Sequence, residues 1–405
     1  MLMKIFFLFI VVVVIPEVLF ASTADIEYKN QAIVINKIEY KAKIPKGYQL
    51  EILTTDLDSP RMMAFTRAGE LLIGSKSGKI YRLRKPYTNP EVIAELPDYP
   101  HSVIARGKFL YIAQTNGLYV TPYRAGQKYI PKSSIEMYIQ LPGGGGHNSR
   151  TVKLGADKKI YVSLGITGNC SNEYLDKSYP VNDRRGGVLV LNEKNKLIWE
   201  TYASGLRNPV GFDWHPGTNI MYASNNGPDH HGYEQPPEYF SRVEKNSFHG
   251  MPWYQYDGVN IIRDDCIDSE PPVSANKVVM PVLTFPARNA PMGVAFINNE
   301  RFGTNFINDA VIALRGSWGT KPSGGFFGSR SSRRHPKLVI ARFNNEKAVR
   351  VDDLVTGFQL KNGKRWLRPV GVTVGHDGAL YFTSDGGIDG LYRLKKVDKQ
   401  FDHVE

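Results

Sequence analysis

The chain has 405 residues, of which 42% are hydrophobic and 22% are charged, so it is long enough to bury a large core. Its formal net charge of +12 first suggests nucleic acid as a partner. The basic run Arg330-Ser-Ser-Arg-Arg334 is interpreted instead as an exposed loop face, and no nucleic-acid partner is expected. Two cysteines exclude a zinc site built from cysteines, and no linker-like stretch divides the chain.

The N-terminus has the pattern of a secretory signal peptide. Lys4 precedes the apolar run 5–15, and Ser22-Thr-Ala24 supplies the small residues that precede a cleavage point. The run is too short for a comfortable membrane span, so we expect a signal peptide at 1–24 and no stable span after cleavage. The predicted location is periplasmic or secreted. There Cys170 and Cys266 would meet an oxidising environment, but whether they pair is left open by the sequence.

The rest of the chain, 25–405, repeats one short phrase, in which a polar or turn-forming start leads into an apolar strand. A turn and a second strand usually follow, as in Leu380-Tyr-Phe382, and then a third, as in Gly390-Leu-Tyr-Arg-Leu394. Repeats of this kind predict an all-β, six-bladed β-propeller in one domain. The six copies are Ser59-Pro-Arg-Met-Met-Ala-Phe65, Tyr99-Pro-His-Ser-Val-Ile-Ala105, Gly146-His-Asn-Ser-Arg-Thr-Val152, Leu206-Arg-Asn-Pro-Val-Gly-Phe212, Ala290-Pro-Met-Gly-Val-Ala-Phe296 and Leu367-Arg-Pro-Val-Gly-Val-Thr-Val374.

Propeller geometry brings the starts of these phrases together. The inner strands of all blades run along the central channel in one direction, so equivalent positions meet on one face. We therefore expect one pocket among residues that are far apart in the sequence. The alternative is that basic residues before strands are merely solvated loop ends. The residues that open the strands are Arg61, His101, His147, Arg207 with Asn208, Pro291 and Arg368.

Two longer segments add chemical detail. The first is Leu141-Pro-Gly-Gly-Gly-Gly-His147, and the second is Gly205-Leu-Arg-Asn-Pro-Val-Gly-Phe212 with Asn226-Gly-Pro-Asp229 downstream. Together they resemble the pyrroloquinoline quinone (PQQ) dependent glucose/sorbosone dehydrogenases, most closely the sorbosone-dehydrogenase-like branch. The resemblance runs from about Lys46 to Leu394. It implies an exported enzyme that oxidises a sugar or an aldehyde, with PQQ and Ca²⁺ as cofactors and an external electron acceptor.

His147 is the candidate general base. Oxidation of an alcohol by hydride transfer requires a base for the hydroxyl proton, and a neutral imidazole can take that proton near neutral pH. The four glycines before His147 let the backbone approach a flat ligand closely. The alternative is a histidine that is simply hydrogen-bonded in a loop. By resemblance, His147 matches the base of the family.

Arg207 and Asn208 are candidates to polarise a quinone carbonyl, because a cation and an amide can both donate toward developing negative charge. The alternative for Arg207 is a salt bridge to a neighbouring loop. The resemblance assigns Ca²⁺ to the main-chain carbonyls of Gly227 and Pro228, and oxygen ligands suit that ion. The same Asn-Gly-Pro sequence is also strong turn chemistry, and both readings can hold.

The remaining cofactor-binding candidates are His101, Arg315, Trp366 and Arg368. By resemblance, Arg315 and Arg368 would pair with the cofactor carboxylates, and Trp366 replaces one cation of the family pattern. The indole could stack on the cofactor or cap a blade. His101 stands where the best-known members carry a glutamine.

One departure concerns the base itself. The family often has an aspartate after Gly165, where this chain has Ile166, so a group that orients the base is missing unless Asp229 or another acid replaces it. Two alternatives to the dehydrogenase therefore stay open. One is a catalytically silent propeller that binds carbohydrate or protein. The other, which fits the basic openers less well, is a metal-dependent lactonase.

Overall fold

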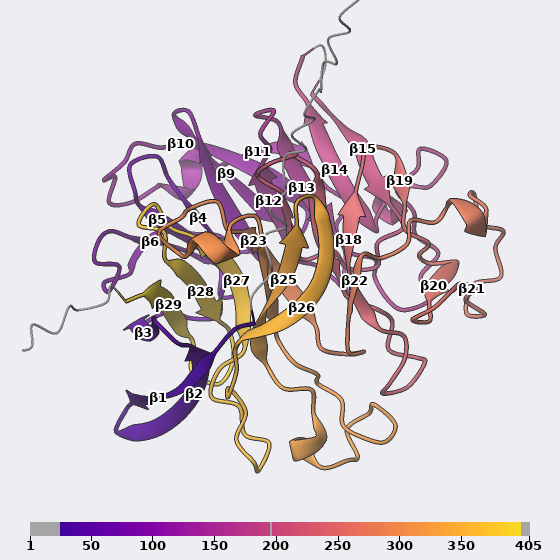
Figure 1. The fold of residues 1–405 in the computed structure, drawn as a ribbon. Coiled ribbons are helices and arrows are strands. Elements are labelled where there is room, and N and C mark those ends of the chain that lie inside the picture. The colour runs from indigo at the N-terminus through magenta and orange to yellow at the C-terminus, as the bar shows by residue number, and fades with distance from the viewer. Residues whose placement is uncertain (1–24, 195–196, 398–405) are drawn as a thin grey trace, which may run out of the picture.

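The computed structural model describes residues 25–194 and 197–397, so the predicted signal peptide lies outside the described residues. The described chain is a six-bladed β-propeller, as the repeats predict. Figure 1 shows its sheets arranged around a common centre. In the described ranges, five short 3-10 helices lie in the connections, at Lys132–Ser134, Val181–Asp183, Ala275–Lys277, Thr304–Phe306 and Arg330–Ser332. None of the helices in the described part of the chain is both long and apolar enough to cross a membrane.

Each blade is an antiparallel sheet of four strands that follow one another from the centre outward. Blade 1 contains β4 (Pro60–Phe65), β5 (Leu71–Ser75), β6 (Lys79–Leu83) and β7 (Glu91–Glu95); blade 2 contains β8 (Ser102–Arg106), β9 (Phe109–Gln114), β10 (Gly117–Pro122) and β11 (Glu136–Gln140). Blade 3 contains β12 (Arg150–Leu154), β13 (Ile160–Leu164), β14 (Gly187–Asn192) and β15 (Ile198–Ser204), with the short parallel strand β19 (Ser247–Phe248) at its edge. Blade 4 contains β16 (Phe212–Trp214), β17 (Met221–Asn225), β18 (Glu238–Val243) and β22 (Leu283–Phe285); blade 5 contains β23 (Pro291–Phe296), β24 (Ala310–Leu314), β25 (Lys337–Asn344) and β26 (Lys347–Val355).

Blade 6 closes the ring with strands from both ends of the described chain. It contains β27 (Pro369–Val374), β28 (Leu380–Ser384) and β29 (Gly390–Lys396), and its outer strand is β3 (Tyr48–Thr54). The register pairs Leu394 with Leu50. Hydrogen bonds between β3 and β29 therefore connect the beginning of the propeller to its end and close the ring of blades.

Two hairpins lie outside the blades. β1 (Tyr28–Ile35) pairs with β2 (Ile38–Pro45), and β20 (Tyr254–Tyr256) pairs with β21 (Ile261–Arg263). The first hairpin buries one side on the core that blades 5 and 6 share, where Ala42 and Ile44 have no exposed surface. A backbone bridge between Lys43 and Thr356 fixes it against the end of β26.

Every repeated phrase leads into an inner strand, namely β4, β8, β12, β16, β23 and β27. Three of these phrases contain a glycine where neighbouring backbones nearly touch. A Cβ on Gly211 would lie 2.0 Å from the Met292 carbonyl oxygen, and one on Gly293 would lie 2.6 Å from that of Val370. The glycines are thus required by the close approach of adjacent inner strands.

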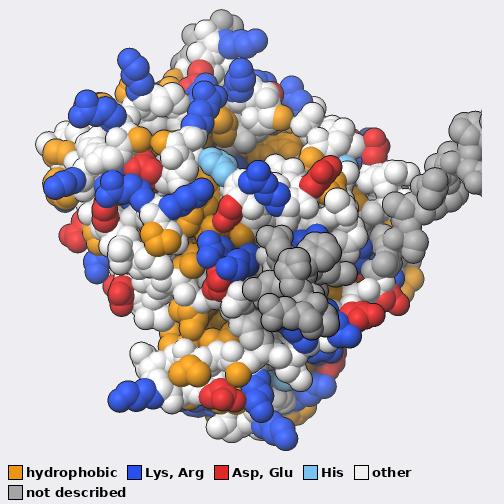
Figure 2. Space-filling model, turned by 60° about the vertical axis from the view of Figure 1, so that its left-hand side comes forward, with side chains coloured by type: hydrophobic (Ala, Val, Ile, Leu, Met, Phe, Trp, Pro, Cys, Tyr) orange, Lys and Arg blue, Asp and Glu red, His pale blue; other side chains and the backbone are white. Residues whose placement is uncertain are grey.

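On the face drawn in Figure 2 the charged side chains are dispersed. Figure 2 shows Lys and Arg side chains over much of the visible face, interspersed with Asp and Glu, rather than gathered in one stripe. Of the basic run, Arg330 and Ser331 are exposed as expected for a loop face, whereas Arg333 and Arg334 are partly buried and Arg334 pairs with Glu234.

The contact at Gly211 generates a stability prediction. Gly211→Ala is expected to lower the free energy of unfolding by about 1–3 kcal/mol, since the added methyl group has no room beside the next inner strand. Urea unfolding followed by fluorescence would measure the change. Gly145→Ala is the control, because no atom lies within 4 Å of its added Cβ. Equal stability of both variants would contradict the tight packing.

Candidate active site at the starts of the inner strands

His147 lies three residues before β12, at the end of the glycine run. Its Nδ1 is hydrogen-bonded to the carbonyl oxygen of Ile166, so Nδ1 carries the proton and Nε2 keeps a free electron pair. Burial and the charge of Arg207 lower the pKa of His147 to about 4. The side chain is therefore a neutral imidazole over the physiological range, in the form that a general base requires.

Gly165 allows the three candidate groups to meet. A Cβ at this position would lie 2.6 Å from His147 Cβ, 2.7 Å from Asn208 Oδ1 and 3.0 Å from the Arg207 carbonyl oxygen. The next residue, Ile166, donates its backbone N–H to that same carbonyl at 2.9 Å. The segment directly after β13 thus packs against the loop that leads into β16, and the base and the Arg-Asn pair lie side by side.

Arg185 holds the glycine run in place. Its guanidinium is fully buried and donates to carbonyl oxygens of the run and of the strand end beside it, and to one hydroxyl. Arg150, also fully buried, donates to the His147 carbonyl oxygen at 2.9 Å and to that of Pro142 at 2.7 Å. The acceptors of Arg185 are Gly165 O, Gly143 O, Gly145 O, His147 O and Thr167 Oγ1, at 2.8–3.2 Å.

Arg207 is buried and surrounded by polar groups from three loops. It donates to Asn169 Oδ1 at 2.6 Å and lies 3.6 Å from an Asp229 carboxylate oxygen. Asp229 also pairs with the buried Arg288 at 3.1 Å. The salt-bridge alternative for Arg207 is therefore present, but one carboxylate is shared between two guanidinium groups. The Nε of Arg207 and the Oδ1 of Asn208 have no hydrogen-bond partner among the described residues.

Gly227 and Pro228 follow β17 and are buried. Within the described part of the chain, no donor is hydrogen-bonded to either carbonyl oxygen. Buried carbonyl groups are normally paired, so these two are suited to accept an ion or another ligand. The loop is fixed from behind by Asn226, whose side-chain amide donates to the Pro291 carbonyl oxygen at 2.6 Å.

A second cluster lies where blades 5, 6 and 1 meet. Asp385, which follows β28 directly, forms ion pairs with both Arg61 and Arg315, the latter at 2.6 Å. Burial would raise the pKa of Asp385, but the two arginines hold it below its usual range. Arg315 was expected to face cofactor carboxylates, and it already has a carboxylate partner in the protein.

Arg368 has no such partner. It donates to the carbonyl oxygens of Arg315 and Gly316, both at 3.2 Å, and no described carboxylate lies within ion-pair distance. Burial and the charges of Arg315 and Arg365 lower its pKa to about 9. Arg365, whose pKa is lowered to about 10 by burial and by Arg333 and Arg315, is likewise without a carboxylate in the described structure. The cluster thus carries more positive than negative charge.

His101 lies between the two clusters and is completely buried. Its Nδ1 is 3.1 Å from the Arg150 carbonyl oxygen, while its Nε2 has no partner among the described residues. Burial and the charge of Arg61 hold its pKa well below the usual value. It contacts the inner strand next to His147, and the sequence-based role in cofactor binding remains a prediction.

Trp366 lies outside this group, so of its two readings, stacking on a cofactor and capping a blade, the first is not supported. The indole is 1% exposed and stacks on Tyr40 of the β1–β2 hairpin, with ring centroids 4.8 Å apart. Its Nε1 donates to the Gly357 carbonyl oxygen at 2.7 Å. The side chain therefore belongs to the core that blades 5 and 6 share, which agrees with the other reading of Trp366 as a blade cap.

Sequence reasoning also missed several residues of the site. Asp385 directly follows the second strand of blade 6, the place that Asn226 occupies in blade 4, and this equivalence could have indicated it. Arg185 gave no such signal, because it precedes a third strand and reaches back across the blade. The other residues missed are Arg150, Asn169, Arg288 and Arg365.

The sequence model of the TrAA12-like family matches residues 42–239 and 267–396, which is most of the chain. The chain belongs to this family. Its TrAA12-like core spans all six blades, and the unmatched 240–266 covers the β20–β21 hairpin and the loop that contains Cys266.

The chain is also similar to individual proteins. An uncharacterised protein of Borreliella burgdorferi is 27% identical over 379 residues, which cover 89% of this chain and 93% of that one. The family AA12 carbohydrate-active enzyme of Trichoderma reesei has a TM-score of 0.72 at 17% identity, covering 93% of this chain and 99% of that one. The PQQ domain of pyranose dehydrogenase from Coprinopsis cinerea has a TM-score of 0.70 at 17% identity, covering 88% and 97%. At these identities the solved structures establish the fold.

The contacts of Arg185 predict its role. Arg185→Lys keeps the charge but loses the planar fork of donors, so the glycine run 143–146 should open more often. Hydrogen exchange at the backbone amides of this glycine run is expected to accelerate, with little change elsewhere in the protein. Arg184→Lys is the matched control, because its side chain contacts Tyr179 and Lys177 instead. Unchanged exchange at 143–147 in the Arg185 variant would rule out the bracing role.

The pKa of His147 predicts a titration. Because burial and Arg207 disfavour the protonated ring, it should stay neutral as the pH falls through 6.5 and become charged only near pH 4. Imidazole proton resonances recorded by NMR without any added cofactor would follow this, with His147→Ala used for assignment. A midpoint at or above 6.5 would show that the ring is not held in the neutral form.

Proposed function

We propose that this protein is an exported oxidoreductase that oxidises a sugar, or an alcohol or aldehyde derived from one, with PQQ as hydride acceptor and Ca²⁺ as a helper ion. The observation that carries the proposal is the combination of a neutral, oriented base with partly buried cations that have no carboxylate of their own. His147 supplies the first, and Arg368 with Arg365 supplies the second. The names of the similar solved proteins, a PQQ domain and soluble sugar dehydrogenases, support the same reading.

The donor set suits an anionic cofactor. Removing a charge from water is costly unless the charge is paired, and the partly buried Arg368 and Arg365 lack a paired carboxylate within the described structure. Unpartnered atoms of Arg61, His101 and Arg207 provide further hydrogen-bonding groups nearby. Carboxylates of PQQ would be held by Arg368 and Arg365, with Arg315 contributing through its shared partner Asp385.

His147 would act on the substrate. Its Nε2 takes the hydroxyl proton of the alcohol, and the carbon that bears this hydroxyl gives up a hydride and becomes a carbonyl carbon. PQQ, when bound, supplies the electrophilic centre that accepts the hydride. Ile166 keeps the proton on Nδ1, so Nε2 stays available. Arg207 and Asn208 donate toward the negative charge that develops.

Calcium is proposed at Gly227 and Pro228. The two buried carbonyl oxygens have no donor among the described residues, and oxygen atoms are the ligands that Ca²⁺ prefers. Arg207 donates to the Asn226 carbonyl oxygen in the same loop at 3.4 Å, so an ion there would lie close to the Arg-Asn pair.

The proposed location is the periplasm or the cell exterior. Cys170 and Cys266 form a disulfide across 96 residues, with Cα atoms 5.4 Å apart. Such bridges persist mainly in oxidising compartments, which fits the signal-peptide pattern of 1–24. The substrate class remains a sugar or sugar-derived alcohol or aldehyde, and the acceptor that reoxidises the cofactor is external.

The test separates chemistry from binding. PQQ titrated into the protein with CaCl₂ is expected to raise the melting temperature and to change the quinone absorption. His147→Ala should lower turnover of a sugar by about two to four orders of magnitude while PQQ binding changes little. Arg368→Ala should weaken PQQ binding by about 2–5 kcal/mol.

Chelation of divalent ions should abolish turnover, and added calcium should restore it.

Two exposed residues provide controls. His376→Ala and Arg301→Ala, both on the surface, are expected to leave binding and turnover unchanged. Absence of PQQ binding by the wild-type protein would refute the proposal. Binding without turnover of any sugar tested would instead favour the catalytically silent propeller.

A further inference from the structure

Two adjacent histidines converge on one buried carboxylate beside the candidate site. His230 Nε2 lies 3.1 Å from Asp264 Oδ1, and His231 Nε2 lies 3.2 Å from Asp264 Oδ2. The Asp264 side chain has no exposed surface, whereas the histidine side chains are 27% and 32% exposed. One side of the group is therefore buried protein, and the other is open to solvent.

The spacing suits a metal ion as well as it suits hydrogen bonds. Bonds of about 2.0–2.1 Å to a tetrahedral Zn²⁺ place neighbouring ligand atoms about 3.3 Å apart. The two nitrogen–oxygen distances are close to this value, and the ligand atoms of the three residues all lie within 4.8 Å of one another. The imidazole rings are neighbours, with centroids 3.9 Å apart.

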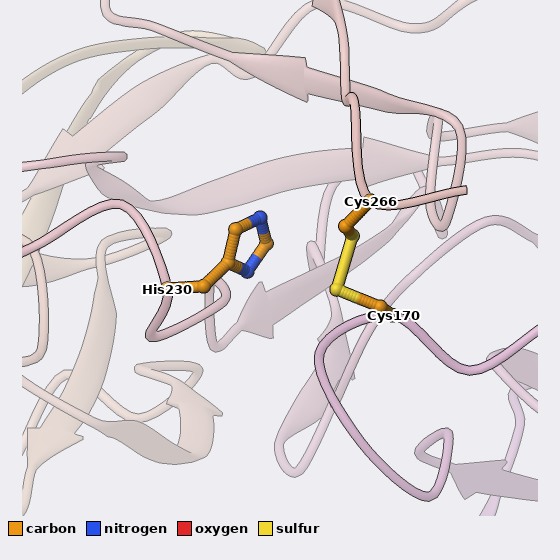
Figure 3. A group of neighbouring side chains, drawn as sticks. All are labelled: Cys170, His230 and Cys266. Atoms are coloured by element: carbon orange, nitrogen blue, oxygen red, sulfur yellow. A yellow bond between two sulfur atoms is a disulfide. The ribbon is translucent and has the colours of Figure 1, made fainter. Parts of the chain in front are cut away.

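The carboxylate is fixed before any ion arrives. Asp264 follows β21, and its backbone N–H donates to the Trp253 carbonyl oxygen at 2.8 Å. The Cys266 backbone N–H donates to Asp264 Oδ1 at 3.1 Å. The disulfide then ties Cys266 to Cys170, which belongs to the loop after β13, and Figure 3 shows the His230 ring beside this bridge. A preformed ligand lowers the ordering cost of binding.

The cluster is continuous with the candidate site. His230 follows Asp229, which pairs with Arg207 and Arg288. Cys170 follows Asn169, whose side-chain oxygen accepts from Arg207 and from the Asp229 backbone N–H. An ion held here would stiffen the loop that follows Gly227 and Pro228.

We propose that His230, His231 and Asp264 form a binding site for a divalent transition-metal ion of the zinc type, with water as the fourth ligand. Two imidazole nitrogens and one carboxylate are the donor set that such ions take, whereas Ca²⁺ prefers oxygen ligands throughout. This site is separate from the calcium position at Gly227 and Pro228. It does not depend on the proposed dehydrogenase activity.

The test is a zinc titration of the metal-free, oxidised full-length protein by isothermal calorimetry. No reductant is added, because the thiols of Cys170 and Cys266 would themselves bind zinc. We expect one saturable site per chain and a rise in melting temperature with zinc concentration. His230→Gln and His231→Gln should each weaken binding by at least about tenfold, since even residues behind the ligands of a metal commonly cost that much. Excess calcium should not compete.

Two further variants complete the design. Asp264→Asn removes the carboxylate charge, and the two histidine variants keep the test informative if Asp264→Asn alters the loop. His376→Gln, an exposed histidine on another blade, should bind zinc like the wild type. The site is refuted if no saturable binding occurs up to about 1 mM zinc. It is equally refuted if the His230 and His231 variants bind as tightly as the His376 control, because the group is then a hydrogen-bonded triad.

Discussion

The whole molecule depends on contacts between each inner strand and the next. A side chain or backbone N–H of one blade donates to a carbonyl oxygen near the start of the neighbouring inner strand: Ser102 to Arg150, Thr151 to Val210, Ser224 to Met292, Thr383 to Arg61, and the Met62 N–H to His101, at 2.6–3.2 Å. Between blades 5 and 6 the close contact is made by a glycine, because a Cβ on Gly293 would lie 2.6 Å from the Val370 carbonyl oxygen. These bonds lie just behind the residues that open the strands. The same ring that closes the propeller therefore fixes where the candidate site residues stand, and a site built on strands is held more rigidly than one built on free loops.

The sequence was sufficient to predict the strands, the number of blades and the meeting of His147 with Arg207 and Asn208, because all of these follow from a local repeat. Contacts between residues far apart in the sequence could not be predicted from it. Asp385 pairs with Arg61, which is 324 residues away in the sequence. Its carboxylate therefore neutralises part of the positive charge that we had expected to bind a cofactor. Trp366 was misplaced for a related reason. Its position in the phrase resembles that of a site residue, but the N-terminal hairpin covers it, and nothing in the local sequence indicates where that hairpin packs.

Ile166 stands where the resemblance leads one to expect an aspartate, and this has a specific chemical consequence. A backbone carbonyl orients the ring of His147 as well as a carboxylate would, since either accepts the Nδ1 proton. A carbonyl carries no full charge, however, and it stabilises the protonated ring less than an aspartate does. The low pKa of His147 follows from burial without a nearby anion and from the positive charge of Arg207. The geometry of a base is thus kept, while its affinity for the proton is reduced.

An anion bound in the channel would change this balance. Positive charge from Arg207, Arg185 and Arg150 now opposes protonation of His147, and Arg315 and Arg365 likewise lower the pKa of Arg368. A bound anionic cofactor offsets these charges, so it raises the pKa values of both groups, and by linkage it binds more tightly when they are protonated. A further protein carboxylate is then not required beside His147, because a bound anionic cofactor would supply the negative charge. If an anionic cofactor binds here as proposed, it would increase the affinity of the base for the proton, and the excess of arginine over carboxylate at the starts of the inner strands would couple cofactor binding to proton transfer.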